Sequence, residues 1–377
     1  MYEFFMNILY ALERWMGNYG LAVIVFTLIV RVVLFPFDFK SRKSMRKVTA
    51  LQPKMAVLQK KYANDKDKLN RKLSELYKQE GVSPLSGCLP MLLSYPILIL
   101  MFNAMRFCAN DQMVIQVAEF LAQGGTAAPA YKDFLWIKNL YMADNPFVSA
   151  IPGQTSLAAA ADSFRTVLTV DRMQGIIAAV QKDASLLEIL NRPANANLLA
   201  MWNDIVEKIA SAPTQDAWVE FLRSSKVLIE GEKQVTTTYM AQLPTILESM
   251  VQSTQYFAKN CGSTNLNVIL LGTIQKDWNG LLILPVLSAV SQFVMTKLTP
   301  QQPTAASADA QATQSTGKFM TWFFPIFSLW ICFSSTAAFA LYWVASNLLA
   351  MAQTVAVNKY LEKKEKTNHI AGEGIVQ

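Results

Sequence analysis

The sequence predicts an all-α polytopic membrane protein with five transmembrane helices, a basic helical hairpin and a helical insert. Apolar residues make up 52% of the 377 and charged residues only 16%, and the mean hydropathy is +0.23. Several apolar runs reach the length of about 20 residues that crosses a bilayer as a helix. The basic residues, which give a net charge of +7, gather beside these runs. This placement is typical of topology signals in membrane proteins.

The N-terminal part predicts an interfacial amphipathic helix over residues 1–18 and a first span over residues 19–39. Phe5, Leu9 and Leu12 share one face of the first helix, as in helices that lie on a membrane. We expect no cleaved signal peptide, because no basic residue and no small-residue cleavage site flank the apolar core in the usual order. An Arg-rich, acid-poor organelle leader is also missing, so a bacterial plasma membrane is the expected location.

The basic segment over residues 40–86 predicts a helical hairpin. Leu51 and Met55 recur at helical spacing, and the pattern resumes at Leu69 and Leu73 after a polar turn. The two apolar stripes could pack against each other or bind a partner, and both interpretations are compatible. The positive-inside rule places this segment in the cytoplasm and the N-terminus outside.

The rest of the chain alternates apolar and polar segments. The expected order is a second span at 87–107, an extracytoplasmic loop with a helical insert at 108–279, a third span at 280–298, a cytoplasmic linker at 299–317, spans at 318–335 and 336–357, and a cytoplasmic tail at 358–377. The tail is also basic at its start. Five spans place it on the same side of the membrane as the basic segment at 40–86, which agrees with the positive-inside rule.

Arg31 is the one charged residue inside the apolar run from Tyr19 to Phe37. An ionised side chain in a span costs about 3 kcal/mol or more on insertion scales, so it must face water or a partner. An intramembrane charge therefore predicts a functional site. The alternative is an arginine that extends along its helix to the headgroups.

The cysteines and the single histidine indicate no enzyme and no metal site. Cys108 and Cys261 flank the extracytoplasmic loop, where a disulfide would join the two ends of the insert, or both thiols are free. The four cysteines have no metal-ligand spacing. His369 lies in the tail, and no nucleophile and base pair occurs within a span. We expect no cofactor and no catalytic residues.

Four features together resemble the YidC family of membrane protein insertases. They are Arg31, the stretch LYKQEGVSPLSGCLP at 76–90, ILPVL at 283–287 and LYWVASN at 341–347. The resemblance covers roughly residues 1–107, 132–141 and 280–360, but not the insert. We expect the short form of Gram-positive bacteria, which has no large domain ahead of the first span, with an extra extracytoplasmic insert.

The resemblance implies a non-enzymatic insertase whose helices surround a hydrophilic groove, open to the cytoplasm and the lipid but closed to the outside. Arg31 matches the family's groove arginine, Trp343 matches an aromatic residue that faces the groove, and Gln292 is the nearest match to a glutamine of the third span. Small polar residues of the spans are further candidates for the groove lining: Thr27, Ser288, Ser291 and Asn347. Such residues in spans are also common at helix packing contacts.

The expected partners are nascent membrane proteins and the lipid bilayer, with the ribosome, the signal recognition particle machinery and the Sec translocon as further possibilities. We expect a monomer that recognises no specific nucleic-acid sequence. The alternative function is a small anion transporter or channel that uses Arg31. The sequence shows no inverted repeat and no second charge buried in the middle of a span, which favours the insertase.

Overall fold

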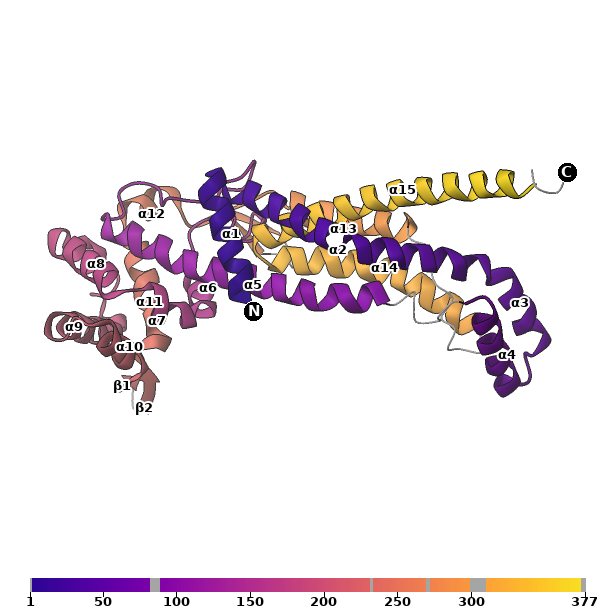
Figure 1. Cartoon of the computed structure of the whole chain (residues 1–377). Helices are drawn as coiled ribbons and strands as arrows, with labels where there is room; N and C mark the ends of the chain where they lie inside the picture. The colour runs from indigo at the N-terminus through magenta and orange to yellow at the C-terminus, as the bar shows by residue number, and fades with distance from the viewer. Residues whose placement is uncertain (1, 82–88, 231–232, 269–271, 299–309, 374–377) are drawn as a thin grey trace.

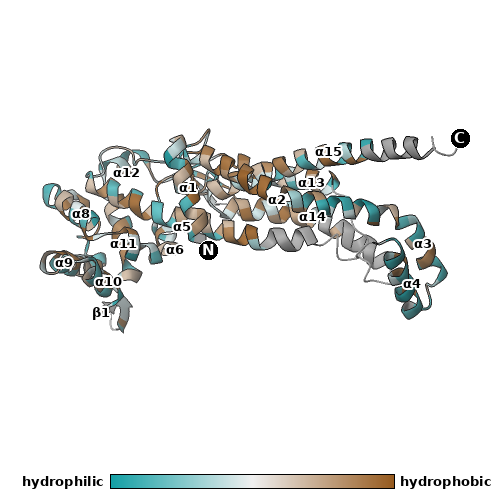
Figure 2. Cartoon of the chain, viewed as in Figure 1, coloured by the Kyte–Doolittle hydropathy of each residue, from teal (hydrophilic) through white to brown (hydrophobic). Residues whose placement is uncertain are grey.

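The computed structural model describes residues 2–81, 89–230, 233–268, 272–298 and 310–373. These residues are predominantly helical, and the molecule is elongated, with a helical bundle between two polar ends (Figure 1). The insert end carries the described residues between 123 and 282. The hairpin end carries α3 (Gln52–Lys61) and α4 (Lys66–Gln79). Hydrophobic residues are concentrated in the bundle, whereas the hairpin and much of the insert are hydrophilic (Figure 2).

The bundle contains α2 (Tyr19–Ala50), α5 (Leu89–Ala122), α13 (Ile283–Leu298), α14 (Ala310–Ser334) and α15 (Ala337–Glu373). Helix α15 packs against both α2 and α13, and α13 packs against α14. Within the described residues, two helical segments are long and apolar enough to cross a membrane, Tyr19–Ala50 and Ala337–Lys363. The apolar parts of α13 and α14 are shorter, so the number of five spans stays a prediction.

Several helices extend beyond the predicted spans. Helix α2 continues past residue 39 to Ala50, and α5 continues past residue 107 to Ala122. Helix α14 already begins at Ala310, inside the predicted linker, whereas residues 299–309 lie outside the described part. Helix α15 runs through most of the predicted tail to Glu373. Polar residues such as Lys, Arg, Gln and Glu are good helix formers, so a fall in hydropathy does not end a helix.

Helix α1 (Tyr2–Met16) packs across α2 and α5 at the insert end. Its Leu9 is fully buried, whereas Trp15 is 80% exposed. A turn with positive φ at Gly17 follows, and Asn18 caps α2 by accepting a hydrogen bond of 3.0 Å from the Leu21 amide. Side-chain caps of this kind satisfy amides that the first helical turn leaves without a partner. The end of α1 is thus fixed against the start of the first apolar helix.

The hairpin at the other end has its own small core. Leu51, Met55, Leu69, Leu73 and Tyr77 are buried together, with further contacts from the end of α2. The two apolar stripes therefore pack against each other. The exposed residues of α3 and α4 are mostly charged or polar, although Val57 is also exposed, so this end of the molecule has a largely polar surface.

The insert was expected to be helical, and this expectation is partly wrong. Its helices are α6 (Gln154–Ala159), α7 (Phe164–Val167), α8 (Val170–Lys182), α9 (Ala196–Ser211), α10 (Gln215–Arg223), α11 (Tyr239–Gln252) and α12 (Gln255–Asn260). Two antiparallel hairpins accompany them, β1 (Ser225–Glu230) with β2 (Lys233–Thr238) and β3 (Ser263–Val268) with β4 (Gly272–Gln275). The first hairpin is rich in β-branched residues, which favour strands.

Helix α5 links the bundle to the insert. Val114, Val117 and Leu121, in its second half, are buried in the same hydrophobic cluster as the residues of α8. Gly175 of α8 lies so close to α5 that an added Cβ would stand 3.2 Å from the Cβ of Ala122. The insert therefore packs on a continuation of a bundle helix.

Candidate functional site

Arg31 lies on α2 at its contact with α15. Its Nη2 donates a hydrogen bond of 2.6 Å to Ser346 Oγ, and its Nη1 lies 3.9 Å from Asp38 Oδ2. The side chains of Arg31 and Asp38 are 22% and 17% exposed, respectively. The guanidinium thus extends from the middle of the apolar run toward the hairpin end, where a carboxylate partly balances its charge.

Two consecutive residues of α15 connect α2 with α13. Ser346 accepts the hydrogen bond from Arg31, and Asn347 Nδ2 donates a hydrogen bond of 3.0 Å to Ser291 Oγ on α13. Polar groups inside an apolar bundle are costly without such partners. We call Arg31, Ser346, Asn347 and Ser291 the polar line, because together they cross from one side of α15 to the other.

Two of the predicted groove residues have the contacts of packing residues. Ser288 is fully buried, and its Oγ lies 2.6 Å from the carbonyl oxygen of Pro285 and 3.1 Å from that of Ser328 on α14. Thr27 Oγ1 donates a hydrogen bond of 2.7 Å to the carbonyl of Val23 in its own helix. Hydroxyl groups in such positions donate their hydrogen bonds to backbone oxygens, and the small side chains let helices approach closely.

Trp343 shares a face of α15 with the polar line, because Ser346 and Asn347 follow it by three and four residues. Its ring packs against Phe339 with 5.7 Å between centroids, and its Nε1 is buried without a hydrogen-bond partner among the described residues. Gln292 is half-buried and follows Ser291 by one residue, which turns it by about 100° around α13. Trp343 thus lies on the face of α15 that carries the line, whereas Gln292 lies beside Ser291 on a neighbouring face of α13.

The sequence reasoning missed three residues of this region. Ser346 and Asp38 are the partners of the Arg31 side chain, and Gln353 Nε2 donates a hydrogen bond of 3.4 Å to the Arg31 carbonyl. Asp38 stands two helical turns after Arg31, so helical spacing alone could have suggested it. The partners on α15 depend on how two distant helices pack, which local spacing does not give.

At the insert end, residues 132–151 and 277–282 form a collar around the ends of the bundle helices. Asn139 and Asn279 are fully buried at its centre. The Asn139 amide donates to Asn279 Oδ1 at 2.8 Å, and Asn279 Nδ2 donates to the Asn139 carbonyl at 2.9 Å. Asn139 Nδ2 also reaches Gln116 Oε1 of α5 at 2.8 Å. Two segments that are far apart in the sequence are thus paired side by side.

The collar also satisfies the ends of three bundle helices. Asp144 accepts hydrogen bonds from the Leu281 amide at 2.9 Å and the Leu284 amide at 2.7 Å, at the start of α13. Carboxylates are favourable at helix N-termini. The amides of Ala337 and Ala338 of α15 donate to collar carbonyls, and Asn145 donates to the carbonyl of Phe333 at the end of α14. The bundle is therefore held together at its insert end.

The sequence left a disulfide and two free thiols open for Cys108 and Cys261, and the structure has the free thiols. Cys108 and Cys261 are both buried and unpaired. Helix α5 continues past Cys108, so this cysteine lies inside a helix and not at the root of a loop. Cys261 follows α12, where burial and the neighbouring Asp277 raise the pKa of its thiol to about 12. Such a thiol stays protonated and unreactive at neutral pH.

The sequence of this chain matches a known protein family. The sequence model of the family described as 60Kd inner membrane protein matches residues 11–206 and 235–365. The match runs into the insert, which corrects the expectation that the resemblance leaves the insert out. The greater part of the chain thus follows the pattern of this family.

Several relatives carry the name membrane protein insertase YidC. The protein of Geobacter sp. strain M21 is 39% identical over 140 residues, which are 37% of this chain and 23% of that protein. The Fusobacterium nucleatum protein is 39% identical over 104 residues, or 28% of this chain and 51% of that protein. The Pelobacter propionicus protein is 32% identical over 211 residues, or 53% and 36%. The matched segments thus span about a quarter to a half of these relatives. Because the family pattern covers most of its residues, the chain belongs to the 60Kd inner membrane protein family, which is the family of these YidC insertases.

Proposed function

We propose that this chain is a membrane protein insertase that takes the hydrophilic tails of nascent membrane proteins into a groove and releases their apolar segments into the bilayer. The observation that carries the proposal is the polar line, in which Arg31 is held between two apolar helices by Ser346 and faces Asp38. The names of the relatives support the same function. The groove lining would include Arg31, Ser346, Asn347, Ser291 and Trp343, with Thr27, Ser288 and Gln292 nearby.

The chemistry of this line suits the transfer of a short tail. The barrier to moving a tail across hydrocarbon is mostly the desolvation of its polar and acidic groups. Hydroxyl and amide side chains shorten the dry path, and a cation attracts an acidic tail more strongly there than at the surface, because water screens less. Asp38 would compete for the guanidinium, so an entering carboxylate would exchange with it. No covalent step is needed, so the chain would act as a chaperone and not as an enzyme.

The collar is an argument for a groove that is closed at the insert end. Its buried Asn139 and Asn279 and the bonds to three helix ends leave little room for a tail to leave on that side. We therefore place the insert end and the N-terminus outside, and the hairpin end and the C-terminus in the cytoplasm, in a bacterial plasma membrane. The basic residues before the hairpin and after residue 358 agree with this orientation.

The partners follow from this placement. A nascent membrane protein and the bilayer are required. The ribosome, the signal recognition particle machinery and the Sec translocon are partners of the basic cytoplasmic surfaces, with contacts that salt weakens. The chain would work as a monomer, because its polar line is made within one molecule.

The test is reconstitution of the purified chain in liposomes without ATP. Two substrates with the same apolar segment are offered, one with a short acidic tail and one with a neutral tail of equal length. We expect the chain to protect the acidic tail from external protease and empty liposomes not to do so. If neither tail is protected and the same vesicles take up a small anion, the result would instead support an anion transporter.

A further inference from the structure

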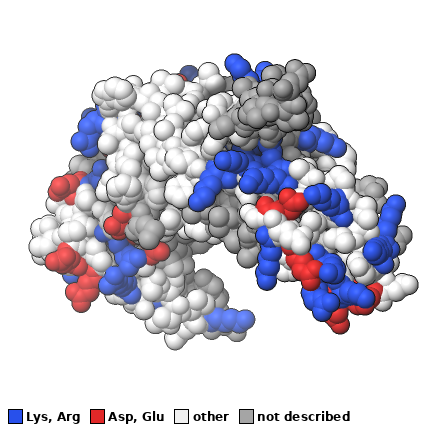
Figure 3. All heavy atoms as spheres, turned by 45° about the vertical axis from the view of Figure 1, so that its right-hand side comes forward, with Lys and Arg blue, Asp and Glu red and all other residues white. Residues whose placement is uncertain are grey.

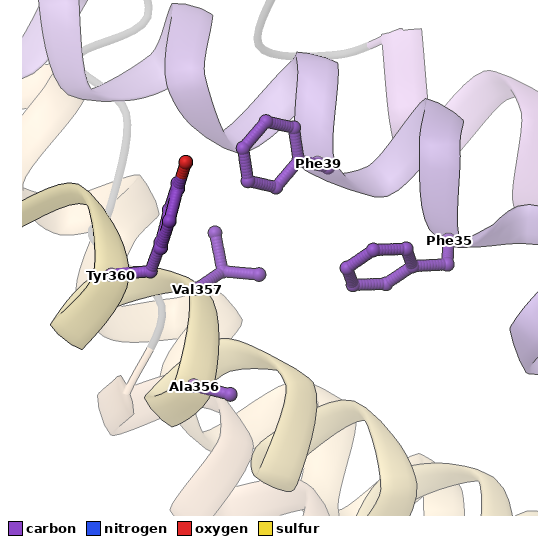
Figure 4. A pocket seen from close by; sticks show the side chains of 5 residues that line it. All are labelled: Phe35, Phe39, Ala356, Val357 and Tyr360. Atoms are coloured by element: carbon purple, nitrogen blue, oxygen red, sulfur yellow. The ribbon is translucent and has the colours of Figure 1, made fainter.

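A cleft separates α2 and α15 on the hairpin side of the polar line. Phe35, Phe39, Ala356, Val357 and Tyr360 line it, and its volume is about 380 Å³ (Figure 4). The ring centroids of Phe39 and Tyr360 are 6.1 Å apart across the cleft. Every lining residue is apolar or aromatic, and the volume is that of a site for a small ligand.

Two polar contacts between the helices bound the cleft. On one side Arg31 of α2 binds Ser346 of α15, and on the other Arg46 of α2 binds Glu362 of α15 at 3.0 Å. The two arginines are about 22 Å apart along a straight helix. A transmembrane helix needs about 30 Å of apolar length, so it does not fit between the two contacts. The cleft therefore suits a thinner, shorter apolar group.

The charges beside the cleft are mainly positive. Lys40 and Lys43 follow Phe39 on α2, Lys359 precedes Tyr360 on α15, and all three side chains are exposed. Figure 3 shows Lys and Arg gathered beside the hairpin end. Two acidic groups lie nearby, and both already face arginines, since Glu362 pairs with Arg46 and Asp38 lies beside Arg31. The three lysines thus leave a net positive rim.

We propose that this cleft binds an acyl chain of one anionic phospholipid, whose headgroup lies against Lys43 and Lys359. The apolar walls end where both helices become cationic, which matches the order of acyl chain and anionic headgroup in such a lipid. Lys43 lies one turn beyond Phe39 and Lys359 about one turn beyond Ala356, on the same helical faces. The lipid would hold α2 and α15 apart at the cytoplasmic side of the polar line. This inference adds a ligand to the proposed insertase and rests on its placement in the membrane.

The test is native mass spectrometry of the full chain in detergent with added phosphatidylglycerol or phosphatidylcholine of identical acyl chains. We expect the chain to retain more phosphatidylglycerol. Ala356→Trp, which fills the cleft from an exposed position, should lower the retention of both lipids. The matched control Val355→Trp, on the next and also exposed residue, should leave it unchanged. Glycerol phosphate alone should not compete, because it has no acyl chain.

A charge variant tests the headgroup contact without touching the apolar walls. Each lysine near an anionic headgroup is worth about a five-fold change in affinity. Lys43→Gln with Lys359→Gln should therefore remove most of the preference for phosphatidylglycerol. The control pair Lys60→Gln with Lys78→Gln, on the hairpin, should keep it.

Three results would overturn the lipid site. They are equal retention of the two lipids by the unaltered chain, retention that Ala356→Trp does not change, and a photocrosslinker at position 356 that captures a nascent substrate and no lipid. Lipid retention is measured without insertion, so its loss leaves the insertase proposal standing. Failure of insertion would likewise leave lipid binding as a separate result.

Discussion

Arg31 is balanced by partners that differ in strength. Ser346 offers a neutral hydrogen bond at 2.6 Å, and Asp38 offers a charge at the longer distance of 3.9 Å. A guanidinium with a tight carboxylate partner would be neutralised, whereas one without any partner would be costly in a span. The observed arrangement lies between these limits. It keeps the arginine in place and leaves donor groups for an incoming anion.

We predict that Arg31→Ala impairs insertion of substrates with acidic tails and that Arg31→Lys retains much of it. The reason is that the proposed role needs a charge in a wet cavity and not a two-pronged clamp. Protease protection of acidic and neutral tails in proteoliposomes measures this. Arg106→Ala, which removes an exposed arginine of α5, is the matched control. Equal insertion by the Ala variant and the unaltered chain would remove the electrostatic step.

Asn279 is a second residue with several roles at once. Its side chain accepts from the Asn139 amide and donates to the carbonyls of Asn139 and Ala143, each at 2.8 or 2.9 Å. We predict that Asn279→Ala lowers stability by about 2 to 4 kcal/mol, because buried groups left without a partner cost about 1 to 3 kcal/mol each.

Thermal unfolding in detergent measures this loss as a fall in the melting temperature. The control is Asn265→Ala, which removes an exposed asparagine of β3 and should leave the melting temperature within about one degree. If the two variants had the same melting temperature, the collar would not be a stabilising element.

At the scale of elements, hydropathy predicted where apolar helices lie but not where helices end. The run from Tyr19 predicted α2, yet the helix continues through Lys40 and Arg46 to Ala50. Helix propensity depends on side-chain and backbone entropy and is high for charged residues as well. The strands β1 and β2 were missed because a short apolar run between polar segments is ambiguous between helix and strand.

The candidate site was predictable only in part, for a related reason. Arg31 stands out in the sequence because a charge within a span is costly and therefore rare. Asn139, Asn279 and Ser346 carry no such signal, because polar residues are common in loops and at helix contacts. Their roles arise from packing between segments more than 100 residues apart, such as Asn139 with Asn279 at a separation of 140.

Asp204 joins three elements of the insert. It lies on α9 and accepts hydrogen bonds from Lys226 of β1 and from Tyr239 Oη of α11, the latter at 2.5 Å. Burial opposes ionisation, but the hydrogen bonds and the Lys226 charge together lower the pKa of Asp204 below its ordinary value. A carboxyl whose pKa is lowered in the folded state stabilises the fold above its unfolded pKa, which is about 3.9. This contribution is lost as the pH falls through the folded pKa.

We predict that Asp204→Asn lowers the melting temperature at pH 7 and that the difference from the unaltered chain shrinks below about pH 4. Melting curves between pH 7 and pH 3 measure this. Asp216→Asn removes an exposed carboxylate of α10 and serves as the control, with little change expected at any pH. A difference for Asp204→Asn that is constant over the whole range would show that ionisation is not the cause.

At the scale of the whole molecule, the insert and the bundle share one hydrophobic core. The same cluster of buried residues contains Leu9 of α1, Met105 and Val117 of α5, and Trp202 of α9. The roots of the insert also pair, because the Ala150 amide donates to the Asp277 carbonyl at 3.0 Å. The insert is therefore attached through α5 as well as through its own ends. Movement of the insert would be coupled to α5 and, through α5, to the bundle.

This coupling predicts how fragments of the insert fold. Residues 150–276 alone would leave the buried face of α8 without its partner, because Met173 and Ile176 belong to the cluster that α5 completes. We expect this fragment to melt broadly, with a weak near-ultraviolet circular dichroism signal from its buried Trp202 and Trp218. The longer fragment 108–276, which includes the second half of α5, should melt in a sharper transition at a higher temperature. Val117→Asp in the longer fragment should abolish this gain, whereas a sharp transition in 150–276 itself would show that the insert is an independent domain.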